Sequence, residues 1–272
     1  MKKTLLTLSM LLTCLLGTQA QTQTLILDDS FNLTEKINAA ADDCAENGTK
    51  YTIRFGKRAI NQNNWNVLAL PFDVKPGVLS RAFGYAAVDI LVVDNPDPRT
   101  MHFAVTTSGI IPAGTPFLVR PGDDYQNFED VVNFTKVTVK TVEPQMAQSD
   151  KNGNSIIAVF DKTSFYGAGY WYMSQGMWKS ASTYTEKKPV TLKPLRAYID
   201  LTGTKSKVAP RIVIDEPDGT TTVIDAITFS KGSFSTDSRQ DDGWYTVTGL
   251  RLSEEPTAKG VYIHKARKVI IK

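Results

Sequence analysis

Few side chains in this sequence have the types and spacing that catalysis or metal binding requires. The two histidines, His102 and His264, stand in separate apolar segments, and no His-Glu-x-x-His or Cys-x-x-Cys pattern is present. The chain also lacks a Gly-x-Ser-x-Gly turn and a glycine-rich phosphate loop. A cysteine–histidine pair would need Cys44 to meet His102. The sequence therefore predicts no catalytic residue, no metal site and no cofactor, and a protein that is not an enzyme.

Adjacent aspartates are the remaining acid–base candidates. The sequence contains the pairs Asp28-Asp29, Asp42-Asp43, Asp123-Asp124 and Asp241-Asp242. A glycosidase needs only two carboxyl groups at a suitable separation, one of them with a raised pKa. Nothing in the sequence fixes such an acid, and adjacent aspartates in loops are usually solvated, so a glycan hydrolase is a second alternative.

One segment matches part of a calcium-loop pattern. Oxygen-bearing side chains occupy its positions 1, 3, 5 and 12 as Asp150, Asn152, Asn154 and Asp161. The sixth position lacks the usual glycine, and expected strands rather than helices flank the segment. Since Asn-Gly between two strands also predicts a hairpin turn, both calcium binding and a simple turn stay open.

A group of aromatic residues is the better binding candidate. Its members are Tyr166, Tyr170, Trp171, Tyr172, Trp178 and Tyr184. Aromatic rings exposed on a β-sheet can stack against sugar rings. In a strand, Tyr170 and Tyr172 share one face and Trp171 takes the other. We expect Trp171, Trp178, Tyr170 and Tyr172 to contact a ligand, and the alternative is an aromatic hairpin that completes the core.

The first twenty residues predict a secretory signal peptide. Lys2 and Lys3 precede an apolar stretch from Leu5 to Leu16, and the small residues Thr18 and Ala20 fit a cleavage site after Ala20. The apolar stretch is too short to span a bilayer, so the mature chain is expected to have no membrane-spanning segment. The sequence predicts a secreted or outer-membrane surface protein. A lipoprotein anchored through Cys14, or a periplasmic protein, is the alternative location.

The net charge limits the classes of partner, and the cysteine content limits how the mature chain can be stabilised. The formal net charge is +3, and removal of Lys2 and Lys3 with the signal leaves +1. That balance does not indicate nucleic acid or a membrane surface as a partner. Cleavage of the signal peptide also removes Cys14, so Cys44 has no second cysteine in the mature chain to pair with. A hydrophobic core without a disulfide must therefore stabilise the mature chain.

Residues 32–47 predict the one clear helix. Asn32 is the expected N-cap, with Glu35 three residues later as in a capping box. Leu33, Ile37 and Cys44 recur at helical spacing and form an apolar face, and Gly48 fits the left-handed C-terminal position.

The remainder of the main segment predicts strands. Trp65 to Phe72 is the densest apolar run after the signal, and its centre, 67–70, is typical of a strand buried on both faces. Many short apolar or alternating segments separated by Gly and Pro predict an all-β fold, a β-sandwich of immunoglobulin-like or jelly-roll type. We expect this domain to cover 21–228, followed by a polar linker at 229–242 and a small β module at 243–272.

The last thirty residues carry the most specific pattern in the chain. Its residues are Gly243, Trp244, Tyr245, Gly249, Gly260, Val261, Tyr262, Lys268, Val269 and Lys272. This segment resembles the C-terminal sorting domains of exported Bacteroidetes proteins that use the type IX secretion system. The resemblance implies recognition of the C-terminus by secretion machinery.

The body of the chain resembles β-rich secreted or surface proteins of the same group. The matching pieces are Trp65–Val74, Leu79–Gly84, Ala113–Val119 and Leu195–Tyr198. The resemblance implies location and fold more than a reaction. Together these observations predict an exported, non-catalytic binding or adhesion protein, with glycan as the expected ligand. A structural scaffold component of a surface assembly is the first alternative.

Overall fold

The structure is a computed structural model, and contacts divide its chain into two compact units, Met1–Thr228 and Phe229–Lys272. The residues that it describes are 22–56, 60–123, 125, 134–205, 210–216, 218–224, 244–246, 251–252, 256–257, 260–264 and 267–271. The expected signal peptide and linker lie outside the described residues.

The described part of the first unit is mostly β and includes the helices α1 (Thr34–Asn47) and α2 (Pro76–Ala82). Its strands are β1 (Thr22–Asp28), β2 (Lys50–Gly56), β3 (Asn66–Leu68), β4 (Ala87–Leu91), β5 (Thr100–Val105), β6 (Phe117–Arg120), β7 (Phe134–Val137), β8 (Gln145–Ser149), β9 (Ser155–Val159), β10 (Thr163–Phe165), β11 (Tyr170–Ser174), β12 (Met177–Ser180), β13 (Val190–Leu192), β14 (Arg196–Asp200), β15 (Arg211–Asp215) and β16 (Thr221–Ile224).

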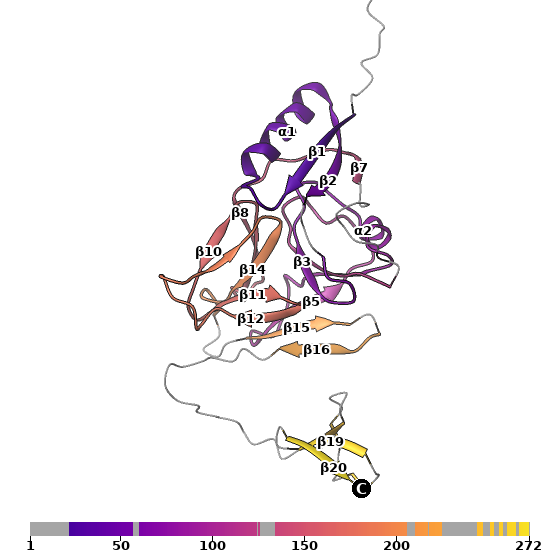
Figure 1. Ribbon diagram of the computed structural model, residues 1–272, viewed down its shortest axis with the longest axis vertical. Coiled ribbons are helices and arrows are strands. Elements are labelled where there is room, and N and C mark those ends of the chain that lie inside the picture. Colours follow the sequence, from indigo (N-terminus) through magenta and orange to yellow (C-terminus); the bar gives the residue numbers. More distant parts are fainter. Residues whose placement is uncertain are drawn as a thin grey trace, which may run out of the picture. The chain divides into compact units, whose positions relative to one another are not determined.

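The described part of the chain starts with a strand–helix–strand unit whose two strands are parallel, and the sequence analysis did not predict this unit. Strands β1 and β2 pair in parallel, with Leu25 opposite Ile53 and Leu27 opposite Phe55. Parallel neighbours need a long connection, and α1 supplies it, lying against both strands in Figure 1. Strand β7 adds to β2 in the antiparallel sense. The all-β description is therefore correct only in the coarse sense of a mostly β fold.

Helix α1 is capped by a residue from a distant part of the chain. Asp161 Oδ1 accepts hydrogen bonds from the backbone N–H groups of Leu33 at 2.9 Å and Thr34 at 3.0 Å. The expected cap, Asn32, instead accepts from the N–H of Lys162, so that prediction is wrong. The C-terminal prediction is confirmed, because Gly48 has φ 68° and its N–H donates to the carbonyl of Cys44.

A six-stranded sheet contains the central apolar run. Its strand order is β16-β15-β5-β4-β6-β3. Residues 67–70 are all buried, and β3 ends within this run at Leu68, three residues ahead of Pro71, which confirms a buried strand that stops near the proline. Strands β4 and β5 pair in the antiparallel sense.

A five-stranded sheet has the order β12-β11-β14-β9-β8. Strands β8 and β9 are joined through a tight turn in which the Asp150 N–H donates to the Asn154 carbonyl at 2.9 Å. Gly153 has φ 85° in this turn, and an added Cβ would lie 2.4 Å from the carbonyl oxygen of Gly203. The hairpin interpretation of Asn152-Gly153 is therefore confirmed.

One buried cluster draws side chains from both of these sheets. Its members include Met101, Phe103, Leu118, Ile212 and Ile214 from the six-stranded sheet. Ile156, Trp171, Trp178, Ala197 and Ile199 come from the five-stranded sheet. We call this group the inter-sheet cluster. A separate cluster joins α1 and α2 to the three-stranded sheet and to the other face of the six-stranded sheet.

The second unit contains a small sheet of the order β18-β17-β19-β20. Its strands are β17 (Trp244–Thr246), β18 (Arg251–Leu252), β19 (Gly260–His264) and β20 (Arg267–Ile271).

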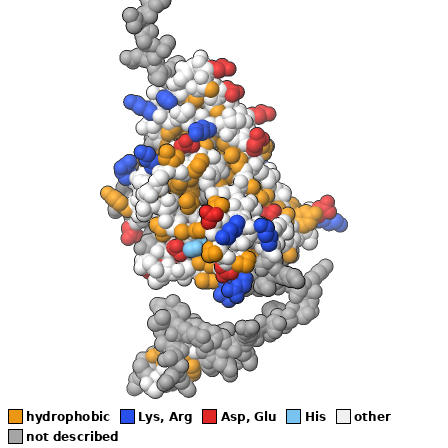
Figure 2. Space-filling view, turned by 180° about the vertical axis from the view of Figure 1, so that it is seen from behind, with side chains coloured by type: hydrophobic (Ala, Val, Ile, Leu, Met, Phe, Trp, Pro, Cys, Tyr) orange, Lys and Arg blue, Asp and Glu red, His pale blue; other side chains and the backbone are white. Residues whose placement is uncertain are grey.

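Among the described residues of the whole chain, no helix has the length and apolar character needed to cross a membrane. Figure 2 shows basic and acidic side chains interspersed over the visible face of the first unit.

The long-range cap of α1 gives a stability prediction. Replacing Asp161→Ala removes the acceptor for two N–H groups of the helix N-terminus, so we expect a loss of about 1 kcal/mol in unfolding free energy. Urea denaturation followed by circular dichroism measures this. Asp161→Asn keeps an oxygen acceptor and is the matched control, expected to retain most of that stability. Equal losses in both variants would contradict the capping role.

Candidate functional site

The two tryptophans of the predicted ligand site lie inside the first unit. Trp171 and Trp178 are each 5% exposed and belong to the inter-sheet cluster. Alternate residues of a strand point to opposite faces, and these two point toward the facing sheet. The expectation that they contact a ligand is not met, since so enclosed a ring presents no face. Their arrangement is that of the alternative, an aromatic hairpin that completes the core.

The two tyrosines of the predicted site lie on the opposite face of the same sheet and are half-buried. The register places Tyr172 between Tyr198 of β14 and Lys179 of β12. Tyr170 lies opposite Asp200 of β14. The structure therefore separates the four predicted contacts into a buried tryptophan pair and a more accessible tyrosine pair.

Several aromatic rings gather on this second face, where Phe165 and Tyr198 belong to a third buried cluster and Tyr170, Tyr172 and Tyr184 are partly buried against it. Phe165 stacks on Tyr198 with ring centroids 4.5 Å apart, and Tyr170 contacts both rings at 5.7 and 6.1 Å. Tyr184, in the loop after β12, meets Tyr172 edge-on at 6.0 Å. We call Tyr170, Tyr172, Tyr184 and Tyr198 the tyrosine face. The short β10–β13 sheet carries Phe165 over Tyr198, which leaves Tyr198 only 6% exposed.

The hydroxyl groups of the tyrosine face are held by hydrogen bonds. The hydroxyl groups of Tyr172 and Tyr184 form a hydrogen bond with 2.9 Å between their oxygens. The Tyr198 hydroxyl donates to Gln145 Oε1 at 3.0 Å. Burial, followed by the hydrogen bond to Tyr184, raises the pKa of Tyr172 to about 12. Burial likewise raises the pKa of Tyr198 to about 12, so both phenols keep their protons at neutral pH.

A row of small polar groups runs beside Tyr170. Asp200 lies opposite Ser155, and Ser155 lies opposite Ser149. The two serine hydroxyls are 2.7 Å apart. Asp200 Oδ1 accepts from the N–H and hydroxyl of Thr202, and no described residue donates to its Oδ2. Aromatic rings beside a carboxylate oxygen and hydroxyls are the groups that hold sugars, by ring contact and by hydrogen bonds to hydroxyls.

Sequence reasoning missed Tyr198 and Asp200 as members of this site. The sequence analysis includes this segment only through Leu195–Tyr198, one of the pieces that resemble β-rich surface proteins. The available signal was the alternation of Arg196, Tyr198 and Asp200 with Ala197 and Ile199, which puts the polar residues on one face. The strand pairing was needed to bring that face beside Tyr170 and Tyr172.

The two aspartates of the calcium-like segment use their carboxylates within the chain, whereas the Asn154 side-chain oxygen is buried with no hydrogen-bond partner among the described residues. Asp150 Oδ1 accepts from the N–H groups of Asn152 at 2.9 Å and Asn154 at 3.0 Å. Asp150 Oδ2 accepts from Asn154 Nδ2 at 2.8 Å. Asp161 caps α1 instead. Among the described residues, no group of three His, Cys, Asp or Glu side chains is placed to hold a metal ion.

The aspartate pairs also serve contacts within the chain. Asp29 is enclosed and forms ion pairs with Arg196 at 2.8 Å and Lys193 at 3.4 Å. Asp28 accepts from the N–H of Ser30. Hydrogen bonds from Asn47 and Tyr51 lower the pKa of Asp43. Asp42 and Asp123 are exposed. Asp124, Asp241 and Asp242 lie outside the described residues.

Cys44 and His102 lie in different surroundings. Cys44 is buried in the cluster beneath α1, which confirms that it serves as a small core residue. His102, on β5, places its Nε2 atom 3.0 Å from Asp215 Oδ1.

The most unusual carboxyl group was not predicted. Asp89 stands in β4, is fully buried, and neither of its oxygens has a hydrogen-bond partner among the described residues. Burial, followed by the charges of Asp215 and Glu216, raises its pKa from 3.8 to about 8. The nearby Glu216 is instead paired with Arg120 at 2.7 Å. In the sequence, Asp89 stands within the mainly apolar segment 88–93. Only the three-dimensional surroundings show that its carboxyl group is buried and has a raised pKa.

The predicted C-terminal motif is partly described. Trp244 and Tyr245 lie in β17, Gly260, Val261 and Tyr262 lie in β19, and Lys268 and Val269 lie in β20. Strand β19 pairs with both β17 and β20. Gly243, Gly249 and Lys272 lie outside the described residues.

Asp89 makes stability depend on pH. The folded state holds the proton of Asp89 more tightly than the unfolded state, so the contribution of this group to stability is greatest below about pH 4 and falls as the pH rises to about 8. The displacement of the pKa corresponds to a loss on the order of 5 kcal/mol. Asp89→Asn should remove this fall and be more stable than the unmodified protein at pH 8.

Urea denaturation at a series of pH values tests this prediction. Asp94→Asn, which changes an exposed aspartate, is the matched control and should keep the pH profile of the unmodified protein. An identical pH profile for Asp89→Asn and the unmodified protein would contradict the assignment of the buried proton to Asp89.

Comparison with known proteins adds no relative to this description. No protein-family model matches the sequence, and no curated protein and no solved structure matches it.

Proposed function

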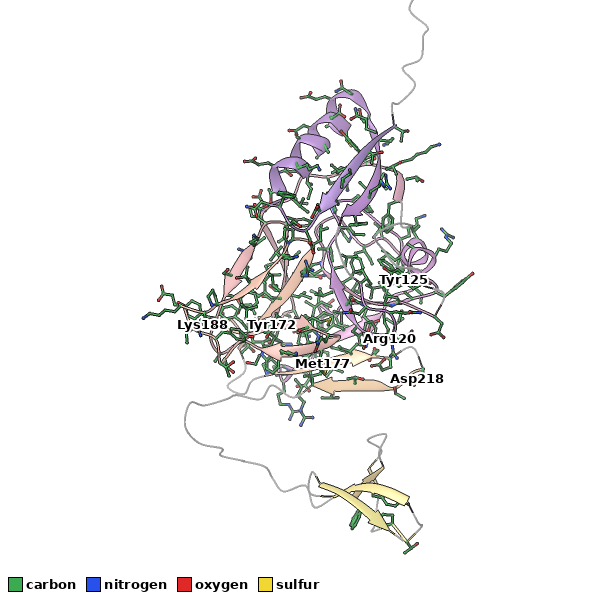
Figure 3. All side chains as sticks on the ribbon, viewed as in Figure 1. Arg120, Tyr125, Tyr172, Met177, Lys188 and Asp218 are labelled. Carbon is green, nitrogen blue, oxygen red and sulfur yellow. The ribbon has the colours of Figure 1, made fainter. Side chains whose placement is uncertain are left out.

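We propose that the chain is an exported, non-catalytic binding or adhesion protein of the cell surface or the medium, and that it binds a glycan on the tyrosine face. The observation that carries the proposal is the placement of Tyr170 and Tyr172 beside Asp200, whose Oδ2 receives no hydrogen bond from a described residue. In Figure 3, Tyr172 is labelled to the left of Arg120 and Asp218 in the lower part of the first unit.

The physical argument rests on what a sugar requires. The C–H surface of a pyranose ring packs on an aromatic ring, while its hydroxyls need donors and acceptors nearby. The tyrosine rings supply the first, and Asp200 with Ser149 and Ser155 supplies the second. Since hydrogen bonds within the face fix Tyr172 and Tyr198, a ligand would pay little ordering entropy there.

The fold type and the export route are part of the same proposal. The shared inter-sheet cluster supports a β-sandwich, of immunoglobulin-like or jelly-roll type. The signal-like residues 1–20 support export. The four-stranded C-terminal sheet supports a module read by secretion machinery of the type IX kind, on a protein of the Bacteroidetes surface group.

Two observations favour the alternatives. The burial of Trp171 and Trp178 is what a structural scaffold component of a surface assembly would show. The raised pKa of Asp89 is what a general acid in a glycan hydrolase would need, but its enclosure keeps a substrate away. We therefore rank binding first, scaffold second and hydrolysis third.

Removal of the rings tests the binding proposal. Tyr170→Ala and Tyr172→Ala should each weaken binding to a responsive polysaccharide by about 1 kcal/mol or more, taking base stacking as the guide. A panel of soluble polysaccharides identifies the ligand, and calorimetry measures the affinity. Tyr85→Ala is the matched control, because Tyr85 is 80% exposed on another part of the first unit. Folded protein that binds no polysaccharide would favour the scaffold, and released products would favour the hydrolase.

The location proposal has its own test. Cell fractionation and the intact mass of the native protein should give a surface or medium protein that starts at Gln21. Loss of the mass of 243–272 would support a processed sorting module. A periplasmic protein that retains Lys272 would contradict the sorting interpretation.

A further inference from the structure

Basic side chains border the tyrosine face. Lys179 of β12 is directly opposite Tyr172 of β11 in the antiparallel register. Directly opposed residues of neighbouring strands point to the same face of a sheet. The half-buried Lys179 side chain therefore lies on the same side as the Tyr172 ring.

A tight turn presents two more lysines next to Tyr184. The N–H of Thr185 donates to the carbonyl of Lys188, and the N–H of Lys188 donates to the carbonyl of Thr185. This closed turn fixes Lys187 and Lys188 close to Tyr184 in the chain. In Figure 3, Lys188 lies at the outer edge of the first unit, on the same side as Tyr172.

These lysines are not neutralised within the described part of the chain. Lys179, Lys187 and Lys188 form no ion pair with a described residue, whereas Lys193 and Arg196 share Asp29. Glu186, in the same turn, is exposed. Three lysines, set against Glu186 and the Asp200 carboxylate opposite Tyr170, give a local charge of +1, and the lysines lie toward the Tyr172 and Tyr184 end of the face.

From this combination we infer that the ligand of the tyrosine face is an acidic glycan, one that carries carboxylate or sulfate groups. The inference rests on the proposed glycan-binding function and specifies its substrate class. The rings of Tyr172 and Tyr184 meet the sugar, and the ammonium groups of Lys179 and Lys188 meet its anionic substituents. Because the phenols stay protonated, they add no negative charge, and Asp200, the carboxylate of this face, lies opposite Tyr170 rather than Tyr172.

Matched pairs of polymers test the class of ligand. Dextran sulfate is compared with dextran, and polygalacturonate with its methyl ester, so that each pair differs in charge and keeps its backbone. The protein should bind the charged member of at least one pair and bind its neutral partner much more weakly. Raising the salt from about 20 to about 300 mM should weaken the preference, since exposed charges are then screened. A preference within the dextran pair indicates recognition of sulfate, and a preference within the polygalacturonate pair indicates recognition of carboxylate.

Charge-matched variants locate the interaction. The double variant Lys179→Gln, Lys188→Gln should lose about fivefold in affinity for the charged polymer at low salt. The double variant Lys75→Gln, Lys162→Gln removes the same charge from residues outside this face and should change affinity by less than about twofold. Tyr172→Ala should also weaken binding, and poly-glutamate, a polyanion without sugar rings, should bind poorly.

Each outcome has a distinct meaning. Equal losses in the two lysine variants, or tight binding of poly-glutamate, would overturn the inference in favour of general charge attraction. Binding of dextran or the methyl ester that matches the charged member would overturn the acidic class and leave the glycan-binding function intact. Failure of the folded protein to bind any polysaccharide, charged or neutral, would overturn both.

Discussion

Burial of apolar side chains between the five-stranded and six-stranded sheets is the interaction on which the first unit depends. Phe103 and Leu118 from one sheet meet Trp171, Trp178 and Ile199 from the other. A large aromatic side chain contributes most when it is fully removed from water. Once the tryptophans of β11 and β12 occupy that space, the period-two geometry of the strands sends Tyr170 and Tyr172 to the other face. The position of the tyrosine face is therefore a consequence of core formation.

Long-range polar contacts then fix the peripheral elements on this core. Asp161, which precedes β10, caps the helix between β1 and β2, so the parallel crossover is tied to the five-stranded sheet. Asp29, which follows β1, is held by Arg196 of β14. Asp161 accepts hydrogen bonds and Asp29 is paired with positive charge, in both cases from distant segments, as buried or half-buried charges require. No described residue donates to Asp89, and its burial raises its pKa.

The division between buried and accessible aromatic residues also shapes the function that we propose. Tyrosine combines an apolar ring with a hydroxyl that can remain in contact with water, so it suits the partly covered outer face. The short β10–β13 sheet covers Tyr198 and leaves Tyr170 and Tyr172 half-buried. Lys179 of β12 lies on the same face as Tyr172, and the turn that follows Tyr184 carries Lys187 and Lys188, so positive charge accompanies the ring surface in this part of the chain.

Local chemistry in the sequence determined the strand-forming run at 67–70 and the left-handed Gly48, and it offered the hairpin at Asn152-Gly153 as one of two interpretations, because each of these features depends mainly on neighbouring residues. The alternation of Tyr170, Trp171 and Tyr172 determined that two faces exist. It did not determine which face is buried, because that depends on the sheet that lies opposite. The cap from Asp161, the parallel pairing of β1 and the pKa of Asp89 likewise required tertiary structure, since their partners are far away in the chain.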